Sequence, residues 1–322
     1  MECLVTGAGG FVGRGVIEAL AAAGHGGIAT GREAPRGLPG GWSGRRRDDV
    51  LAGRVACRPS AIVHLESRQS GPRPSVADTA ECESVNVGGT KEWLDWAARA
   101  GTRRFVLVSS IMAVAPAPGR RDEDSAPAVG EGYGASKARA EAAVRAWCRD
   151  DGSRRGTILR PAPVYGPDEG SNLVPLARRI IAGRPVVIGD GRVLRSIVSR
   201  GNLASAVLFA LGHDAGPCET YTVSDPRPLP LRELVATIAE LSGVPLPRPI
   251  PRWAAALAAP IGDVASLISG REMPIGRERL RAQATDVDFP SDRLVAAGYR
   301  HPESTREGLG RFVAWLRRPA DG

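Results

Sequence analysis

Short, mostly apolar runs recur along the chain and have the length of buried β-strands. Such runs lie at residues 3–6, 61–65, 104–108 and 157–161, and residues 26–31 form a less apolar one. After the first run, Val12, Val16, Ile17 and Leu20 recur at the spacing of one helical face. The pattern predicts a strand, a tight turn and a helix at the N-terminus, with further strands at the later runs.

Three evenly spaced glycines occupy the predicted turn, as Gly7-x-x-Gly10-x-x-Gly13. Gly7 would let the chain reverse, Gly10 would let the backbone approach a pyrophosphate, and Gly13 would let the helix pack on the strand. The helix N-terminus would then offer its N–H groups to an anion. The turn indicates a dinucleotide site, and the alternative is a glycine-rich turn that holds no ligand.

The chain has 322 residues, of which 43% are hydrophobic and 24% are charged, as in ordinary globular proteins. This length allows one large α/β unit or two interleaved lobes. The first residues carry no basic cluster, and glycines interrupt the apolar runs. We therefore expect no signal peptide and no integral membrane segment, and we expect a cytoplasmic location.

The net charge of +8 comes almost entirely from arginine, since Lys91 and Lys137 are the two lysines of the chain. The arginines are spread along the whole sequence, with residues 45–47 as the one tight run. We therefore expect no nucleic-acid partner, and an anionic small substrate fits the charge as well. The five cysteines are scattered without a C-x-x-C pair, so neither a metal site nor a disulfide framework is expected.

Two pairs of polar residues stand where chemistry could occur. Ser109 and Ser110 follow the strand at 104–108, at the sheet edge where ligands bind in parallel α/β folds. Tyr133 and Lys137 are four residues apart at the start of a predicted helix, so they share one face. Because lysine is rare in this arginine-rich chain, the presence of Lys137 next to Tyr133 supports a functional role for the pair.

The order of these motifs resembles the extended short-chain dehydrogenase/reductase superfamily, and within it the NAD-dependent epimerase/dehydratase family. The segments Asn86–Thr90 (NVGGT), Arg160–Pro167 (RPAPVYGP) and Gly298–Pro302 (GYRHP) extend the resemblance over essentially the whole chain. The resemblance implies an α/β fold with a doubly wound parallel sheet, the Rossmann fold, at residues 1–166. It also implies a smaller C-terminal α/β substrate lobe at 167–322, with some segments returning to the sheet, and a homodimer.

The resemblance implies the catalytic roles. Tyr133 would be the acid/base, and Lys137 would supply the cation that stabilises the tyrosine anion. Ser110, rather than Ser109, would hold the same substrate oxygen. Asn86 would support the active-site water and the helix geometry.

The binding residues are implied in the same way. Arg195 resembles an arginine that clamps a nucleotide diphosphate, and Asn172 would join it. The residues implied to contact the cofactor are Gly7, Gly10, Phe11, Val12, Gly13, Arg32, Asp49, Leu65, Ser67, Tyr133, Lys137, Pro161 and Val164.

The end of the strand at 26–31 is where dinucleotide folds contact the adenosine ribose. Gly31 stands where relatives that prefer NAD usually carry an aspartate, and Arg32 can pair with a 2′-phosphate. These two residues favour NADP as the cofactor. Glu33 could still serve the ribose, so NAD stays possible.

The next part of the chain is less regular. Residues 34–60 show no clear third strand, and Asp48 or Asp49 would mark the adenine contact. His64 is expected to be a core histidine of its strand. Glu66 and Ser67 stand where the family often has two alanines beside the cofactor.

The resemblance leads to a reductase or epimerase that acts at C4 of a nucleotide-linked or polyprenyl-linked sugar. Dehydration is disfavoured, because Ile111 and Met112 stand where sugar 4,6-dehydratases carry an acid pair. The alternatives are an NADPH-dependent reductase of a steroid, flavonoid or other small ketone, and a non-catalytic NADP-binding scaffold. The apolar stretch 253–268 would pack on the substrate lobe or, alternatively, contact a lipid-linked sugar.

Overall fold

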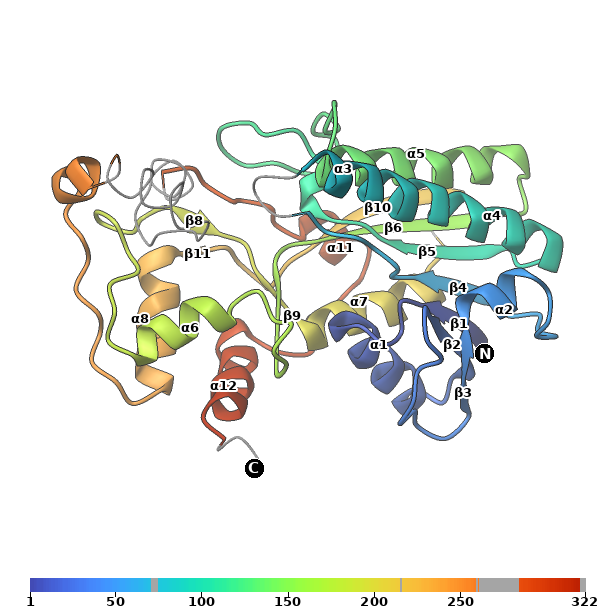
Figure 1. Ribbon diagram of the computed structural model, residues 1–322, viewed down its shortest axis with the longest axis horizontal. Helices are drawn as coiled ribbons and strands as arrows, with labels where there is room; N and C mark the ends of the chain where they lie inside the picture. Colours follow the sequence, from blue (N-terminus) through green and yellow to red (C-terminus); the bar gives the residue numbers. More distant parts are fainter. Residues whose placement is uncertain (71–74, 215, 259, 261–283, 319–322) are drawn as a thin grey trace.

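The centre of the molecule is a seven-stranded sheet with the strand order β10-β6-β5-β4-β1-β2-β3 (Figure 1). The computed structural model describes residues 1–70, 75–214, 216–258, 260 and 284–318. All neighbouring strands of the sheet are parallel, and the order reverses between β1 and β4, which confirms the predicted doubly wound Rossmann sheet. The strands are β1 (Glu2–Thr6), β2 (Gly26–Gly31), β3 (Trp42–Arg46), β4 (Ala61–His64), β5 (Arg104–Val108), β6 (Arg155–Pro161) and β10 (Cys218–Val223).

Helices cover both faces of this sheet (Figure 1). Because successive residues of a strand point to opposite faces, Val5 packs in the core that contains α1 and α7, whereas Leu4 packs in the core that contains α4 and α5. The sheet is therefore apolar on both faces. The flanking helices are α1 (Phe11–Ala22), α2 (Arg47–Leu51), α3 (Val76–Cys82), the π-helix η1 (Glu83–Gly88), α4 (Gly89–Ala100), the 3₁₀-helix η2 (Ile111–Ala113), α5 (Tyr133–Asp150) and α7 (Arg200–Gly212).

A second, smaller hydrophobic core lies at the left of Figure 1, where α6, α8 and α12 pack together. Although it comes late in the chain, β10 pairs with β6 in the central sheet. The boundary predicted at residue 166 stays a prediction. Further elements are β7 (Val164–Tyr165), α6 (Val174–Ile181), β8 (Leu194–Arg195), β9 (Val198–Ser199), β11 (Leu229–Pro230), α8 (Leu231–Leu241), α11 (Asp292–Ala296) and α12 (Thr305–Leu316).

The region 34–60, where the sequence shows no clear third strand, does contain one, so that prediction is wrong. β3 pairs in parallel with β2, and Gly27 lies opposite Trp42. β3 is the edge strand of the sheet, and Trp42 is its one buried side chain. An edge strand needs little apolar surface, so its sequence lacks the apolar run that marks the central strands.

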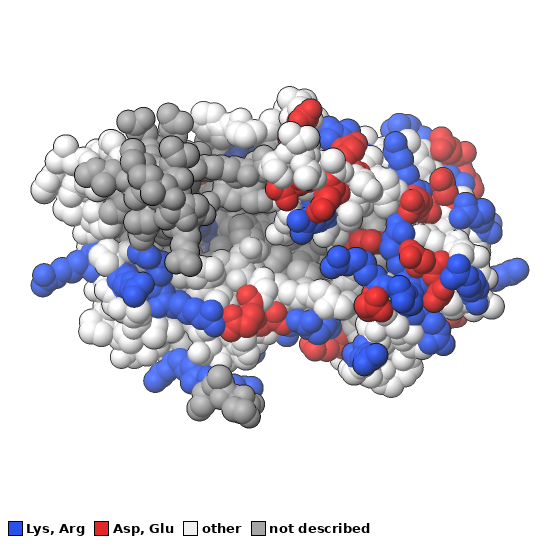
Figure 2. Space-filling view, viewed as in Figure 1, with Lys and Arg blue, Asp and Glu red and all other residues white. Residues whose placement is uncertain are grey.

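Basic and acidic side chains are interspersed over the sheet domain on the face drawn in Figure 2. Arginines of the sheet domain are paired with carboxylates, for example Arg54 with Asp49 and Arg139 with Glu83.

No helix among the described residues is long and apolar enough to cross a membrane. Within the apolar stretch 253–268, residues 259 and 261–268 lie outside the described residues.

Candidate active site

The turn between β1 and α1 packs backbone against backbone. Gly7 has φ +65°, in the left-handed region, and a Cβ atom on Gly13 would lie 2.3 Å from the Gly7 carbonyl oxygen. α1 begins at Phe11, and its N-cap Gly10 has no side chain to cap the first N–H groups. The turn therefore has the tight backbone and the helix N-terminus that fit a dinucleotide pyrophosphate.

A cavity of about 540 Å³ lies at the carboxyl ends of β4, β5 and β6. Ser110 follows β5, and Tyr133 and Lys137 come from the first turns of α5; all three line this cavity. The structure thus brings together three of the residues predicted to be catalytic. The other predicted site residues that line the cavity are Val12, Leu65, Ser67, Pro161, Val164 and Asn172.

Tyr133 has several polar neighbours at its phenol group. The side chains of Ser110, Ser67 and Gln69 line the same cavity. Burial raises the pKa of Tyr133, while these three polar side chains act in the opposite direction. At neutral pH the phenol is therefore protonated and can act as an acid.

Lys137 lies one helical turn after Tyr133 and is 1% exposed. Its Nζ atom donates a hydrogen bond to the carbonyl oxygen of Val108 over 2.9 Å. Burial lowers the pKa of Lys137 to about 8, and the nearby charge of Glu141 opposes this decrease. The amine thus carries its positive charge at neutral pH, next to the group whose anion it would stabilise.

A buried ion pair lies behind Lys137. Arg160 on β6 donates from Nη2 and Nε to the carboxylate of Glu141 over 2.7 and 2.9 Å, and both residues are almost fully buried. The Ser109 hydroxyl donates to the same carboxylate over 2.7 Å. Because Ser109 is engaged in this way, Ser110 is the better placed of the two serines to hold a substrate oxygen.

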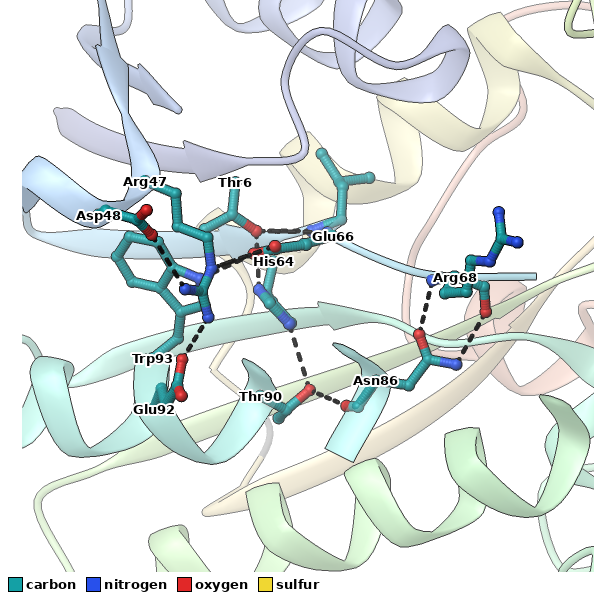
Figure 3. Close-up of polar contacts among 11 residues, drawn as sticks. Thr6, Arg47, Asp48, His64, Glu66, Arg68, Asn86, Thr90, Glu92 and Trp93 are labelled. Carbon is teal, nitrogen blue, oxygen red and sulfur yellow. Dashed lines mark hydrogen bonds and ion pairs between the residues drawn. The ribbon is translucent and has the colours of Figure 1, made fainter. Parts of the chain in front are cut away.

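Asn86 lies in η1 and ties the loop after β4 to α5. Its Nδ2 atom donates to Ser136 Oγ over 2.8 Å and to the Arg68 carbonyl oxygen over 2.9 Å. Its Oδ1 atom accepts from the Arg68 N–H over 2.8 Å, a contact that is visible in Figure 3, and from Ser67 Oγ over 3.1 Å. All four hydrogen-bonding positions of the amide are used by protein, so Asn86 holds the loop after β4 against the start of α5.

His64 is fully buried on β4 and is hydrogen-bonded on both ring nitrogens (Figure 3). Thr6 Oγ1 lies 2.7 Å from Nδ1, and it accepts from two backbone N–H groups of the loop after β4, so its own hydrogen is directed to Nδ1. Thr90 Oγ1 lies 3.2 Å from Nε2 and donates to the Asn86 carbonyl oxygen over 2.6 Å, so it accepts from Nε2. We therefore assign the ring hydrogen to Nε2.

Burial lowers the pKa of His64 to about 3, which keeps the imidazole neutral. The prediction of a core histidine is confirmed. The chain of hydrogen bonds from Thr6 through His64 and Thr90 to Asn86 links the glycine turn to the helix that carries Asn86 (Figure 3).

Glu66 and Ser67 point to different surroundings. The Glu66 carboxylate accepts from the Trp93 indole over 3.1 Å and is paired with Arg47 (Figure 3). Arg47 also contacts Glu92 of α4. Of the two positions where the family often has alanine, Ser67 is therefore the one that lines the cavity.

The predicted binding residues that lie outside the cavity lining are Gly7, Gly10, Phe11, Gly13, Arg32, Asp49 and Arg195. Arg32 is exposed directly after β2, and Asp49 on α2 is paired with Arg54. The Arg195 guanidinium donates over 2.8 Å to the carbonyl oxygens of the preceding residue and of Thr285. The expected contacts of these residues with cofactor or substrate stay predictions.

Some lining residues are absent from the sequence-based prediction of the site. Gln69 adds a polar side chain to the cavity, and Ile111, Met112 and Leu203 add apolar surface to it. Gln69 lies in the loop after β4, so the rule that ligands bind at the carboxyl ends of parallel strands would have pointed to it. Leu203 comes from α7, and the sequence carries no signal for its place.

The family model named NAD dependent epimerase/dehydratase family matches residues 3–224. The chain belongs to this family. The resemblance seen in the sequence motifs is thereby confirmed, and the chain is an enzyme of the epimerase/dehydratase family.

Its relatives include epimerases and reductases. The chain is 24% identical over 245 residues to N-acetyl-alpha-D-glucosaminyl-diphospho-ditrans,octacis-undecaprenol 4-epimerase of Escherichia coli O157:H7, covering 76% of this chain and 74% of that protein. It is 30% identical over 327 residues to 3-diazoavenalumate denitrifying reductase of a Streptomyces species, covering 97% and 100%. The solved structure of MoeE5 in complex with UDP-glucose and NAD has a TM-score of 0.73 at 26% identity and covers 98% and 99%.

Proposed function

We propose that this enzyme transfers a hydride between a nicotinamide cofactor and an oxygen-bearing carbon of a small-molecule substrate. The observation that carries the proposal is the placement of Ser110, Tyr133 and Lys137 around one cavity. The cofactor, when bound, supplies or accepts the hydride. Ser110 holds the substrate oxygen, Tyr133 gives or takes its proton, and the charge of Lys137 stabilises the tyrosine anion.

The proposed cofactor is NADP, with NAD as the alternative. The glycine turn and the N-terminus of α1 fit the pyrophosphate of either one. At the end of β2, Gly31 has no side chain that would repel a 2′-phosphate, and Arg32 and Arg46 add positive charge there.

The proposed substrate is a sugar that is linked to a nucleotide or to a polyprenyl diphosphate, with reduction or epimerisation at C4. The relationship to a polyprenyl-diphosphate-sugar 4-epimerase and to a protein solved with UDP-glucose supports this class. Asn172 lines the cavity and would hold the distal part of such a substrate, together with Arg195. The expected homodimer stays a prediction.

Reduction of a small ketone is the second candidate, and a specific observation favours it. The Arg195 guanidinium contacts backbone carbonyl oxygens, while Ile111, Met112 and Leu203 give the cavity apolar surface. A relative that matches over nearly the whole chain is named a reductase. A scaffold without activity is disfavoured, because the chain retains the acid/base tyrosine and the lysine in one cavity.

Replacement of the proposed acid tests the function. Tyr133→Phe should lower kcat by on the order of 10²–10⁴ while NADPH binding survives. Turnover is followed as interconversion of UDP-glucose and UDP-galactose, and as NADPH oxidation with a panel of 4-keto sugar nucleotides and small ketones. Tyr221→Phe, which removes a buried phenol outside the cavity lining, is the matched control. Full turnover by Tyr133→Phe would remove the tyrosine from the mechanism.

A further inference from the structure

The loop that follows β7 reaches back to the first turn of α1. Residues 166–171 form this loop, which we call the strap. The residues that flank it, Val164 and Asn172, both line the active-site cavity. The Asn172 N–H donates a hydrogen bond to the Val164 carbonyl oxygen over 3.2 Å. The strap therefore begins and ends at the cavity and is closed at its base.

The strap packs directly on Phe11, the first residue of α1. A Cβ atom on Gly170 would lie 3.1 Å from Phe11 Cβ, and one on Gly166 would lie 3.5 Å from the Phe11 ring. The Arg200 guanidinium lies over the same ring, at 5.4 Å from its centroid. The N-terminus of α1 is the part of the turn that fits a pyrophosphate, so the strap lies against the proposed cofactor site.

One ion pair joins the strap to the glycine turn. Arg14, in the first turn of α1, donates from Nη2 to Asp168 Oδ2 of the strap and from Nη1 to the Gly9 carbonyl oxygen over 2.8 Å. The other carboxylate oxygen of Asp168 accepts from the Gly170 N–H over 2.8 Å, which orients the carboxylate within the strap. The Arg14 guanidinium thus binds the turn and the strap at the same time.

We propose that Arg14 and Asp168 are positioning residues of the cofactor site, whose ion pair holds the strap against the glycine turn and slows the release of a bound dinucleotide. The proposal rests on the proposed function, which places the pyrophosphate at this turn and the nicotinamide at the cavity. A dinucleotide in that position extends from the turn to the cavity, and the strap connects the same two places. When the ion pair opens, the strap can lift from the turn and the cofactor can leave.

Electrostatic attraction alone predicts the opposite effect of a substitution at Asp168. Its carboxylate lies near the place of an anionic pyrophosphate, so removal of its charge would by itself strengthen cofactor binding. Asp168→Asn removes that charge and the ion pair but keeps an oxygen that can accept from the Gly170 N–H. Faster release from this variant therefore reports the lost ion pair.

The test measures the rate at which NADPH leaves the protein. In stopped flow, the complex is mixed with excess NADP⁺ and the loss of NADPH fluorescence is followed. Asp168→Asn should release NADPH about fivefold faster than the wild type, as expected for a partly exposed ion pair. Glu169→Gln is the matched control. It removes a neighbouring carboxylate of the strap, whose partner is Arg178 of α6 over 2.6 Å, and should release NADPH at the wild-type rate.

Salt provides a second measurement. The Arg14 side chain is 50% exposed, so salt should screen its attraction to Asp168. The ratio of the release rates of Asp168→Asn and the wild type should therefore fall towards one between about 0.05 and 0.5 M salt. Arg14→Lys keeps the positive charge but lacks the planar fork that reaches both acceptors. It should also release NADPH faster, and it replaces Asp168→Asn if that variant does not fold.

Equal or slower release from Asp168→Asn overturns the proposal, and so does equal acceleration in Glu169→Gln. A ratio of rates that does not change with salt also overturns it, because the ion pair would then not cause the difference. None of these results affects the proposed function, which Tyr133→Phe tests separately. If the wild type binds neither NADPH nor NADH, the proposed cofactor and the role of the ion pair are both wrong.

Discussion

Glu141 lies one helical turn after Lys137 on α5, and both side chains are 1% exposed. The Glu141 carboxylate is paired with Arg160 and also accepts from Ser109. Its negative charge favours the charged form of Lys137, which burial alone would disfavour. The cation of the active site therefore depends on a carboxylate that does not itself line the cavity.

Removal of the Glu141 charge should destabilise the fold. Glu141→Gln leaves the buried guanidinium of Arg160 without a counter-ion, which costs about 3–5 kcal/mol of unfolding free energy. Arg145→Ala is the control, because Arg145 contacts the same carboxylate over 3.2 Å but its side chain is 35% exposed. The unfolding free energy lost in Arg145→Ala should be at most about 1 kcal/mol. Urea unfolding at pH 7 measures the unfolding free energy of both variants. Equal losses would show that the buried ion pair contributes no more to stability than the exposed one.

Lys137 should make stability depend on pH in the alkaline range. Its pKa is about 8 in the folded protein and near the ordinary lysine value of 10.5 in the unfolded chain. Between these values the unfolded chain binds more protons, so the unfolding free energy contributed by this group rises with pH, by up to ~3 kcal/mol.

The measurement is the difference in urea unfolding free energy between the wild type and Lys137→Met at pH 7, 8, 9 and 10. The neutral, similarly long methionine removes the titration and keeps most of the volume. The unfolding free energy of the wild type should increase relative to that of Lys137→Met as the pH rises through 8 towards 10.5. A difference that is constant with pH would mean that Lys137 titrates alike in both states.

Most of the sheet could be predicted from the sequence, because its central strands are buried on both faces and appear as apolar runs. β3 could not, since a strand at the edge that buries only Trp42 resembles a loop. The glycine turn was predictable for a different reason: the close approach of Gly13 to the Gly7 carbonyl oxygen admits no side chain.

The residues proposed to be catalytic could be predicted only in part. Tyr133 and Lys137 are neighbours on one helix, and Ser110 follows a strand, so local spacing identifies them. Ser67 and Gln69 line the same cavity as Tyr133 although they are distant from it in sequence, and no local pattern encodes this placement. The same holds for Arg195, whose guanidinium donates to the carbonyl oxygen of Thr285, a residue that is also distant in sequence.

Arg195 should distinguish the two proposed substrate classes. If it turns to a diphosphate when substrate binds, Arg195→Ala should weaken UDP-glucose binding about ten- to hundredfold and leave NADPH binding intact. Arg192→Ala, which removes a largely exposed arginine of the same segment, is the control. Calorimetric titration of each ligand alone gives the two affinities. Loss of both, or of neither, would favour the small-ketone reductase.

The cofactor preference should follow the charges at the ends of β2 and β3. Gly31 lies opposite Arg46 in the register of these strands, and Arg32 follows directly. Glu33, the residue that could favour NAD, approaches Arg46 at 3.7 Å and has an 83% exposed side chain. Its charge is therefore offset by an arginine and screened by water. A 2′-phosphate placed here would meet guanidinium groups and no unpaired carboxylate among the residues of these two strand ends.

A charge-assisted hydrogen bond contributes about 1.5–3 kcal/mol, so NADPH should bind about ten- to hundredfold more tightly than NADH. Gly31→Asp combined with Arg32→Asn should reverse this order, because a carboxylate then accepts from the ribose hydroxyl and repels the phosphate. Arg99→Ala is the control. It removes an arginine in the last turn of α4, which leads into the start of β5 and therefore lies near the amino ends of the strands, away from the carboxyl ends of β2 and β3. Fluorescence titration of each protein with both reduced cofactors measures the ratio. Equal affinities in the wild type, or tighter binding of NADH, would contradict the role given to Arg32 and Arg46 and would favour an epimerase that retains NAD.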